Sequence, residues 1–177
     1  MQIIKRNGDS EQYNPNKILN RLKIQSRGLS VDYTQVFLDV QQGVYDNITT
    51  LEIDEITANA SAGYVQVHPD YSVLASKLIV SRLQKELDGE WEIRCGAQLD
   101  ESVIIKKYRW NVLPNYDKDY IFDYFGITTF IKVYGLKVED KIVELPSEMF
   151  FRVALYLADT KEEFEEEAVA GAMNFDI

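Results

Sequence analysis

Three cations near the start of the chain carry the strongest chemical signal in the sequence. Lys5 and Arg6 follow a short apolar run, and Lys17 comes two residues after Pro15. Proline is common at the first position of a helix, so Lys17 is expected in a first helical turn, where the backbone favours an anion. Basic side chains converging on a helix N-terminus form a phosphate site. The sequence therefore predicts that Lys5, Arg6 and Lys17 bind a phosphate-bearing ligand; the alternative is that these charges are simply solvated.

A hairpin and a helix are expected to position these cations. Two extended runs, residues 2–6 and 9–13, flank Asn7-Gly8. This dipeptide best accepts positive φ at both centres of a type I′ turn, which predicts a two-residue hairpin. Asn14 is expected to cap a helix that begins at Pro15 and ends at Gly28, the expected C-cap.

Three more helices are predicted before residue 90. Asp32 is expected to cap the second, and Thr49 with Glu52 has the spacing of a capping box that opens the third. The third helix is expected to end near Val67, because His68 precedes a proline and is disfavoured in the α region. A fourth helix over residues 71–83 completes a compact domain.

These motifs also have a family resemblance. The opening residues are Ile3-x-Lys5-Arg6-Asn7-Gly8-x-x-Glu11-x-Tyr13-x-x-x-Lys17-Ile18. Later segments are Thr49-Thr50-x-Glu52-x-Asp54, His68-Pro69-Asp70-Tyr71-x-x-Leu74-Ala75 and Leu83-x-Lys85. In this order they resemble the ATP-cone, the allosteric activity domain at the N-terminus of many ribonucleotide reductase large subunits. Asn7 stands where the family usually has Asp, a change that the turn tolerates.

The resemblance implies a site for ATP or dATP as an allosteric ligand, with Mg²⁺ accompanying the phosphates. It implies that the nucleotide is surrounded by Lys5, Arg6, Glu11, Lys17, Thr50, Asp54 and Lys85. Thr50 would donate to a phosphate or a base edge, and Asp54 matches a position that in part of the family influences discrimination between ATP and dATP. Only the resemblance, and not the residue pattern, brings Lys85 to this site.

Composition excludes several other functions. The 177 residues carry a formal charge of −10 without a basic tract, which disfavours nucleic acid and anionic membranes as partners. No apolar run reaches the ~20 residues of a membrane span, and the N-terminus lacks the apolar core of a signal peptide. One cysteine and one histidine give no intrachain disulfide and no recognisable metal site. The chain is expected in the cytoplasm, with His68 as a turn residue and no role for Cys95.

The second half of the chain resembles the start of the catalytic domain of the same large subunit. The matching positions are Tyr116-Asp117-Lys118-Asp119, Tyr124-Phe125-Gly126, Tyr134-Gly135, Glu144-Leu145-Pro146 and Arg152. Lys118 replaces the usual Arg, and Ser147 the usual Gln. A hairpin is predicted around Glu139-Asp140, a helix from Pro146, and a last helix capped by Asp159 or Thr160.

We therefore predict an α+β, mainly α fold: a small hairpin over a four-helix ATP-cone, then a helical segment with a second hairpin. The predicted domains are the cone at 1–90, a linker at 91–115 that includes a helix somewhere in 99–108, and the truncated catalytic-domain start at 116–177. The last segment is rich in aromatic residues and is expected to dock on the rest of the protein.

The resemblance identifies the N-terminal part of a class I type large subunit, as a truncation or a split piece. The family's barrel holds the radical cysteine and the redox-active pair, so this chain alone is expected to be catalytically inactive, with no catalytic residues of its own. Its partners would be the rest of the large subunit and, through it, the radical-generating small subunit. Two alternatives stay open: a free-standing nucleotide-sensing protein, and a helical interaction domain that no longer binds nucleotide. A DNA-binding regulator is disfavoured by the acidity and by the lack of Cys-x-x-Cys spacing.

Overall fold

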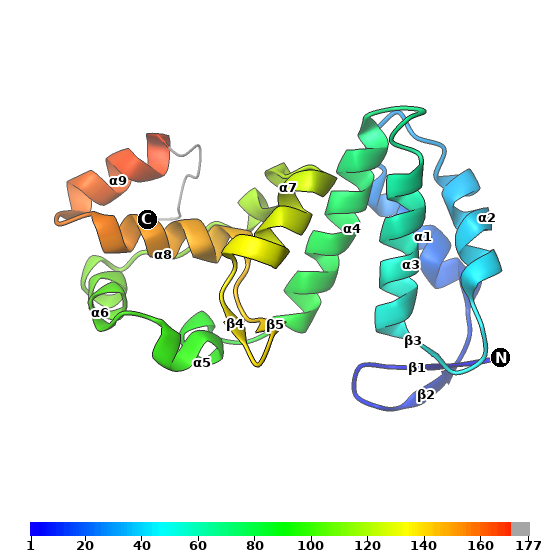
Figure 1. The fold of residues 1–177 in the computed structure, drawn as a ribbon, viewed down its shortest axis with the longest axis horizontal. Helices are drawn as coiled ribbons and strands as arrows, with labels where there is room; N and C mark the ends of the chain where they lie inside the picture. The colour runs from blue at the N-terminus through cyan, green and yellow to red at the C-terminus, as the bar shows by residue number, and fades with distance from the viewer. Residues whose placement is uncertain (171–177) are drawn as a thin grey trace. The chain divides into compact units, whose positions relative to one another are not determined.

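The computed structural model describes residues 1–170, and their side chains as far as residue 166 (Figure 1). The chain divides into two compact units, the first comprising Met1–Arg82 with Phe122–Phe125 and the second the rest of the described chain from Leu83. Helices dominate both units and the strands are short, so the predicted α+β, mainly α class is confirmed. Among the described residues, no helix combines the length and the apolar character that crossing a membrane requires.

A small sheet opens the first unit. Strands β1 (Gln2–Ile4) and β2 (Ser10–Gln12) pair antiparallel, with Ile3 opposite Glu11. A third strand, β3 (Ile48–Thr49), pairs parallel with β1, which gives the order β2-β1-β3. The sequence did not predict β3, because two residues are too few to show the alternation that marks a strand. This strand brings the start of the third helix beside the hairpin (Figure 1).

The turn between β1 and β2 differs from the predicted type I′ turn. The Lys5 amide donates to the Asp9 carbonyl at 2.8 Å, and the Gly8 amide donates to the Lys5 carbonyl at 2.9 Å. The loop therefore has three residues, and within it only Gly8 has positive φ, at 86°. The Asn7 side chain instead bonds to Asp9, accepting from its amide at 3.1 Å. With this local bond, Asn7 stays outside the left-handed region, and Gly8 supplies the positive φ that a three-residue hairpin loop with a bulge requires.

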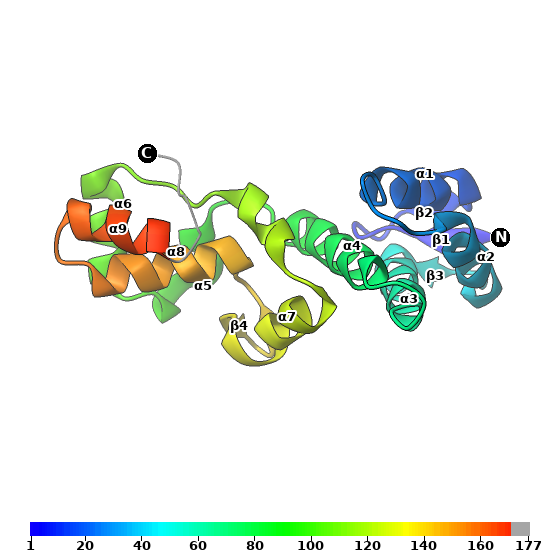
Figure 2. The ribbon, with the colours of Figure 1, turned by 90° about the horizontal axis from the view of Figure 1, so that it is seen from above.

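The four predicted helices of the first unit are present: α1 (Pro15–Gln25), α2 (Tyr33–Gly43), α3 (Thr50–Gly63) and α4 (Asp70–Glu86) (Figures 1 and 2). Their predicted caps are confirmed. The Asn14 side chain accepts from the Asn16 amide at 3.0 Å. Thr49 and Glu52 exchange side chain–backbone bonds of 3.1 and 2.8 Å. Helices α1 and α3 end a few residues earlier than predicted, because residues 26–28 and 64–67, which precede or include the expected stop signals, form turns. The core between the helices includes the fully buried Leu22, Val36, Val40, Ile48, Leu74, Ala75 and Val80.

The remaining α-helices and strands are α5 (Trp91–Cys95), α6 (Glu101–Trp110), α7 (Tyr124–Thr129), β4 (Lys137–Val138), β5 (Lys141–Ile142), α8 (Pro146–Leu157) and α9 (Lys161–Ala170). Short 3-10 helices span Gly96–Gln98 and Tyr116–Ile121, and a π-helix spans Phe130–Tyr134. The hairpin around Glu139-Asp140 is confirmed, and both residues have positive φ, 49° and 62°. The helix from Pro146 is also present, and Thr160 caps α9 by accepting from the Glu163 amide at 3.2 Å.

The segment predicted as a linker, residues 91–115, is instead part of a core. Trp91, Cys95, Leu99, Val103 and Val112 are buried there and pack in one cluster with residues of α8 and α9. The scattered glycines and charges of this segment suggested a linker, yet Trp91, Cys95, Leu99 and Val103 recur at intervals of four. That spacing places them on one side of successive helical turns, where they reach a common core. The boundaries of the predicted domains stay a prediction, and residues 171–177 lie outside the described range.

Aromatic residues in the second half divide between core and surface. Phe151 packs edge-on against Trp91 and Phe164, with ring centroids 5.7 and 5.8 Å apart. Phe130 is buried as well. In contrast, large fractions of Phe125, Tyr134 and Tyr156 are exposed. The structure thus buries more of these rings than the sequence suggested, and docking by the exposed ones stays a prediction.

Candidate functional site

The first cluster of predicted site residues joins the hairpin to α1. The Glu11 carboxylate, on β2, lies 2.6 Å from Lys5 Nζ through one oxygen and accepts from Lys17 Nζ through the other. The hydrogen bond from Lys17, followed by that from Lys5, lowers the pKa of Glu11 to about 2. The lysine side chains stay open to solvent, with 44% of Lys5 and 61% of Lys17 exposed. The structure therefore brings together Lys5, Glu11 and Lys17 as predicted.

The second cluster surrounds Asp54, which lies one turn inside α3. Arg6 Nη2, from the hairpin loop, donates to Asp54 Oδ2 at 2.7 Å. Arg21 Nη1, from α1, donates to the other carboxylate oxygen. Arg21 also donates through Nη2 to the Leu78 carbonyl of α4 at 3.1 Å. One carboxylate thus joins two guanidinium groups from different elements, and one of those groups reaches a third helix.

Arg21 is the residue that the sequence prediction missed. It lies four residues after Lys17 on α1, and side chains at this spacing share one face of a helix. That spacing was a usable signal, because the same face carries the predicted phosphate contact. No pattern in the sequence, however, indicates that α3 supplies the carboxylate between Arg6 and Arg21.

Thr50 and Lys85 are placed differently. Thr50 is the first residue of α3, half-buried, and stands one turn before Asp54 on that helix. Lys85 lies exposed in the last turn of α4, in the second compact unit. Its role at the nucleotide site stays a prediction.

The chemistry that these groups offer is anion binding. Around the two clusters, four cationic side chains pair with Glu11 and Asp54, and Asp9 adds a third carboxylate near Lys5, so the cations still outnumber the carboxylates. Lysine and arginine beside a helix N-terminus are suited to phosphate groups. The described residues contain no group of three or more His, Cys, Asp or Glu side chains arranged to hold a metal ion.

His68 and Cys95, to which the sequence analysis assigned no chemical role, lie in surroundings that do not favour one. His68 Nδ1 accepts from the Asp70 amide at 3.2 Å, at the start of α4, as expected of a turn residue. Cys95 is buried, and burial raises the pKa of its thiol to about 12. A thiol in this state is a poor nucleophile at neutral pH.

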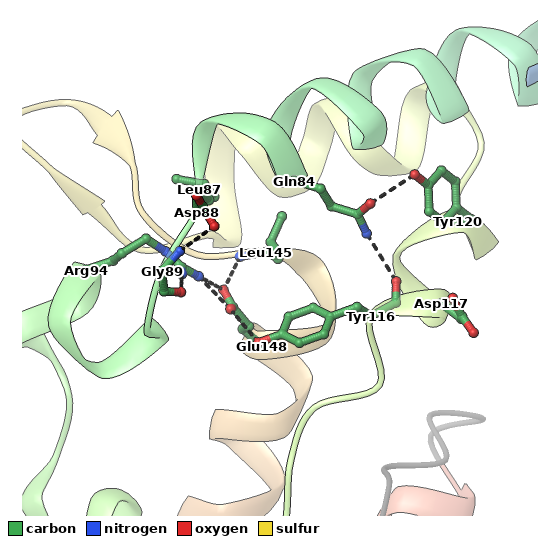
Figure 3. A pocket seen from close by; sticks show the side chains of 10 residues that line it. All are labelled: Gln84, Leu87, Asp88, Gly89, Arg94, Tyr116, Asp117, Tyr120, Leu145 and Glu148. Atoms are coloured by element: carbon green, nitrogen blue, oxygen red, sulfur yellow. Dashed lines mark hydrogen bonds and ion pairs between the residues drawn. The ribbon is translucent and has the colours of Figure 1, made fainter. Parts of the chain in front are cut away.

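A cavity of about 340 Å³ lies in the second unit (Figure 3). Gln84 bridges its wall, donating to the Tyr116 carbonyl at 3.2 Å and accepting from the Tyr120 hydroxyl at 2.9 Å. Arg94 donates to both oxygens of Glu148, at 2.5 and 2.7 Å. Because these polar groups already bond to one another, the cavity gives no indication of a ligand.

Buried ion pairs organise α8 beside this cavity. Glu144, fully buried, accepts two bonds from Arg152 at 2.8 and 3.1 Å. Glu148, also fully buried, accepts from Arg94 and from the Leu145 amide at 2.7 Å. Two residues of the expected catalytic-domain motif are thus partners, Glu144 just before α8 and Arg152 within it.

Comparison with known proteins agrees with this geometry. Residues 1–86 match the ATP cone domain, and residues 120–175 match the all-alpha domain of ribonucleotide reductase. Relatives include ribonucleoside-diphosphate reductase large subunits from Variola virus, 34% identical over 179 residues, and Danio rerio, 31% identical over 176. The large subunit of Arabidopsis thaliana is 34% identical over 176 residues. Each alignment covers 88% of this chain but only 22–23% of the relative.

The chain thus carries an ATP-cone followed by an all-α reductase domain. It belongs to the family of ribonucleotide reductase large subunits, of which it matches the N-terminal part. It spans less than a quarter of the length of the curated relatives that it matches.

Proposed function

We propose that residues 1–86 bind ATP and dATP and report the balance of these nucleotides to a ribonucleotide reductase. The observation that carries this proposal is the basic cluster of Lys5, Arg6 and Lys17 inside the segment that matches the ATP cone domain. The phosphates would lie between these side chains and the first turn of α1. Thr50 and Lys85 would complete the site, with Asp54 nearby as the carboxylate that holds Arg6.

Two carboxylates already engage these cations, which shapes the way a nucleotide binds. The pairs of Glu11 with Lys5 and Lys17 are solvent-exposed, and such pairs contribute little to stability. Phosphate oxygens can therefore replace the Glu11 carboxylate at small cost. Mg²⁺, if present, fits best as a companion of the phosphates with its own waters, since the carboxylates of the site are held by cations.

The chain would regulate rather than catalyse. Its one cysteine, Cys95, is buried with a raised thiol pKa, so it has no exchangeable pair for nucleotide reduction. The barrel and its catalytic cysteines would come from other sequence, and the chain would be a split piece or N-terminal portion of the large subunit. Its partners would be the rest of that subunit and, through it, the small subunit, in the cytoplasm.

Thermal unfolding with ligand tests this function directly. At nucleotide concentrations ~100 times Kd, binding stabilises the native state by ~2.7 kcal/mol. For a chain of this size that corresponds to a rise in Tm of about 5–10 °C. Sodium chloride at matched ionic strength is the control for a general salt effect. No rise with ATP or dATP beyond the chloride control would favour a helical domain that does not bind nucleotide.

A further inference from the structure

We propose that Arg21 is a positioning residue for the nucleotide site, which keeps Arg6 available to phosphate by sharing the Asp54 carboxylate. This inference rests on the proposed function, because it concerns the same ligand. Arg21 itself would not touch the nucleotide. Its effect on affinity would pass through Asp54 to Arg6.

The first support is that the two oxygens of the Asp54 carboxylate have different arginine partners. One oxygen accepts from Arg6 and the other from Arg21, so each guanidinium holds one side of the group. The Asp54 side chain is only 10% exposed, which leaves little water to share the remaining charge. In such a setting a carboxylate with a single cationic partner holds that partner more strongly than a carboxylate with two.

The second support is the unequal anchoring of the two arginines. Arg21 is 18% exposed and is tied to α4 through the Leu78 carbonyl. Arg6 comes from the three-residue hairpin loop and is 35% exposed. Arg21 is therefore the fixed partner of Asp54, and Arg6 is the one that can turn toward a ligand.

Loss of Arg21 should then weaken nucleotide binding indirectly. Without Arg21, the Asp54 carboxylate keeps the bond from Arg6 and attracts that guanidinium more strongly. The phosphate would have to compete with Asp54 for Arg6. Removing the charge of Asp54 in the same chain should release Arg6 again.

Calorimetric titration of ATP into the full 177-residue chain tests this chain of effects. We expect Arg21→Gln to bind about tenfold more weakly than wild type, the loss of roughly one charge-assisted hydrogen bond. We expect Asp54→Asn to bind at least as tightly as wild type, and the double variant Arg21→Gln/Asp54→Asn to recover to within about threefold of wild type. Arg21→Lys, which keeps a charge but cannot hold Asp54 and the Leu78 carbonyl together, should fall between wild type and Arg21→Gln.

The recovery in the double variant is the deciding measurement. If Arg21 merely supports the fold, adding Asp54→Asn removes one more contact and leaves the affinity as low as in Arg21→Gln. That result, or an unchanged affinity in Arg21→Gln, would overturn the proposal. If Arg21→Gln does not fold, as judged by its melting curve, Arg21→Lys and its double variant with Asp54→Asn give the same comparison. Failure of the wild-type chain to bind ATP would instead reject the nucleotide-binding function itself.

Discussion

Replacing Arg6 by alanine should separate nucleotide binding from the stability of the fold. Arg6 contributes an ion pair of 2.7 Å to Asp54, with 35% of its own side chain exposed. An ion pair of this partly exposed kind is worth about 0.2–1 kcal/mol. Asp54 keeps its bond from Arg21, so the substitution does not strand a buried charge. The free energy of unfolding should therefore fall by less than about 1 kcal/mol.

Nucleotide affinity should fall much further in the same variant. A hydrogen bond to a charged group contributes about 1.5–3 kcal/mol, which corresponds to a roughly ten- to hundredfold weaker Kd for ATP. Calorimetric titration gives the Kd, and urea unfolding without ligand gives the stability. Both measurements are made on the full chain.

Two control variants show whether the effect belongs to the site. Lys23→Ala removes one positive charge from the last turn of α1, where the side chain is exposed. His68→Ala changes the turn before α4. Both should bind ATP as wild type does. A loss in either control as large as in Arg6→Ala would show that general charge or fold integrity, and not the Arg6 contact, sets the affinity.

Two further predictions concern the second unit. Glu148→Gln should lower the free energy of unfolding in urea by about 3–5 kcal/mol, because it leaves the Arg94 guanidinium without its buried carboxylate. Glu162→Gln, at an exposed position of α9, is the control. A loss below about 1 kcal/mol in Glu148→Gln would contradict this role. Cys95 should resist an aromatic disulfide reagent at about pH 8 in the native chain and react fully in denaturant, since burial raises its thiol pKa; rapid labelling of the native chain would contradict that burial.

The sequence predicted the helix starts well because short, local bonds define them. Asn14, Asp32 and Thr49 each cap the expected helix with the side chain–backbone bonds that their types favour. Helix ends and the two-residue strand β3 were not predicted with the same success. They depend on which distant segment packs nearby, and no short-range pattern records that.

The predicted nucleotide site shows the same difference between local and distant contacts. Lys5, Glu11 and Lys17 lie within one hairpin and the following helical turn, and the structure brings them together. The pairing of Asp54 with Arg21 joins residues 33 positions apart. Family resemblance pointed to Asp54, but only the folded chain shows that a second arginine shares its carboxylate.

The two clusters should respond differently to a ligand, because their ion pairs differ in burial. Lys5 and Lys17 hold Glu11 at the surface, where exchanging a carboxylate for a phosphate costs little. The pair of Asp54 with Arg21 is largely shielded from water, and breaking it would leave a charge poorly solvated. Arg6 is adjacent to Lys5 in the chain and is bonded to Asp54, so it connects the exposed cluster around Glu11 with the shielded cluster around Asp54. We therefore expect the hairpin loop to adjust when phosphate binds, while α1 and α3 keep the contact that orients it.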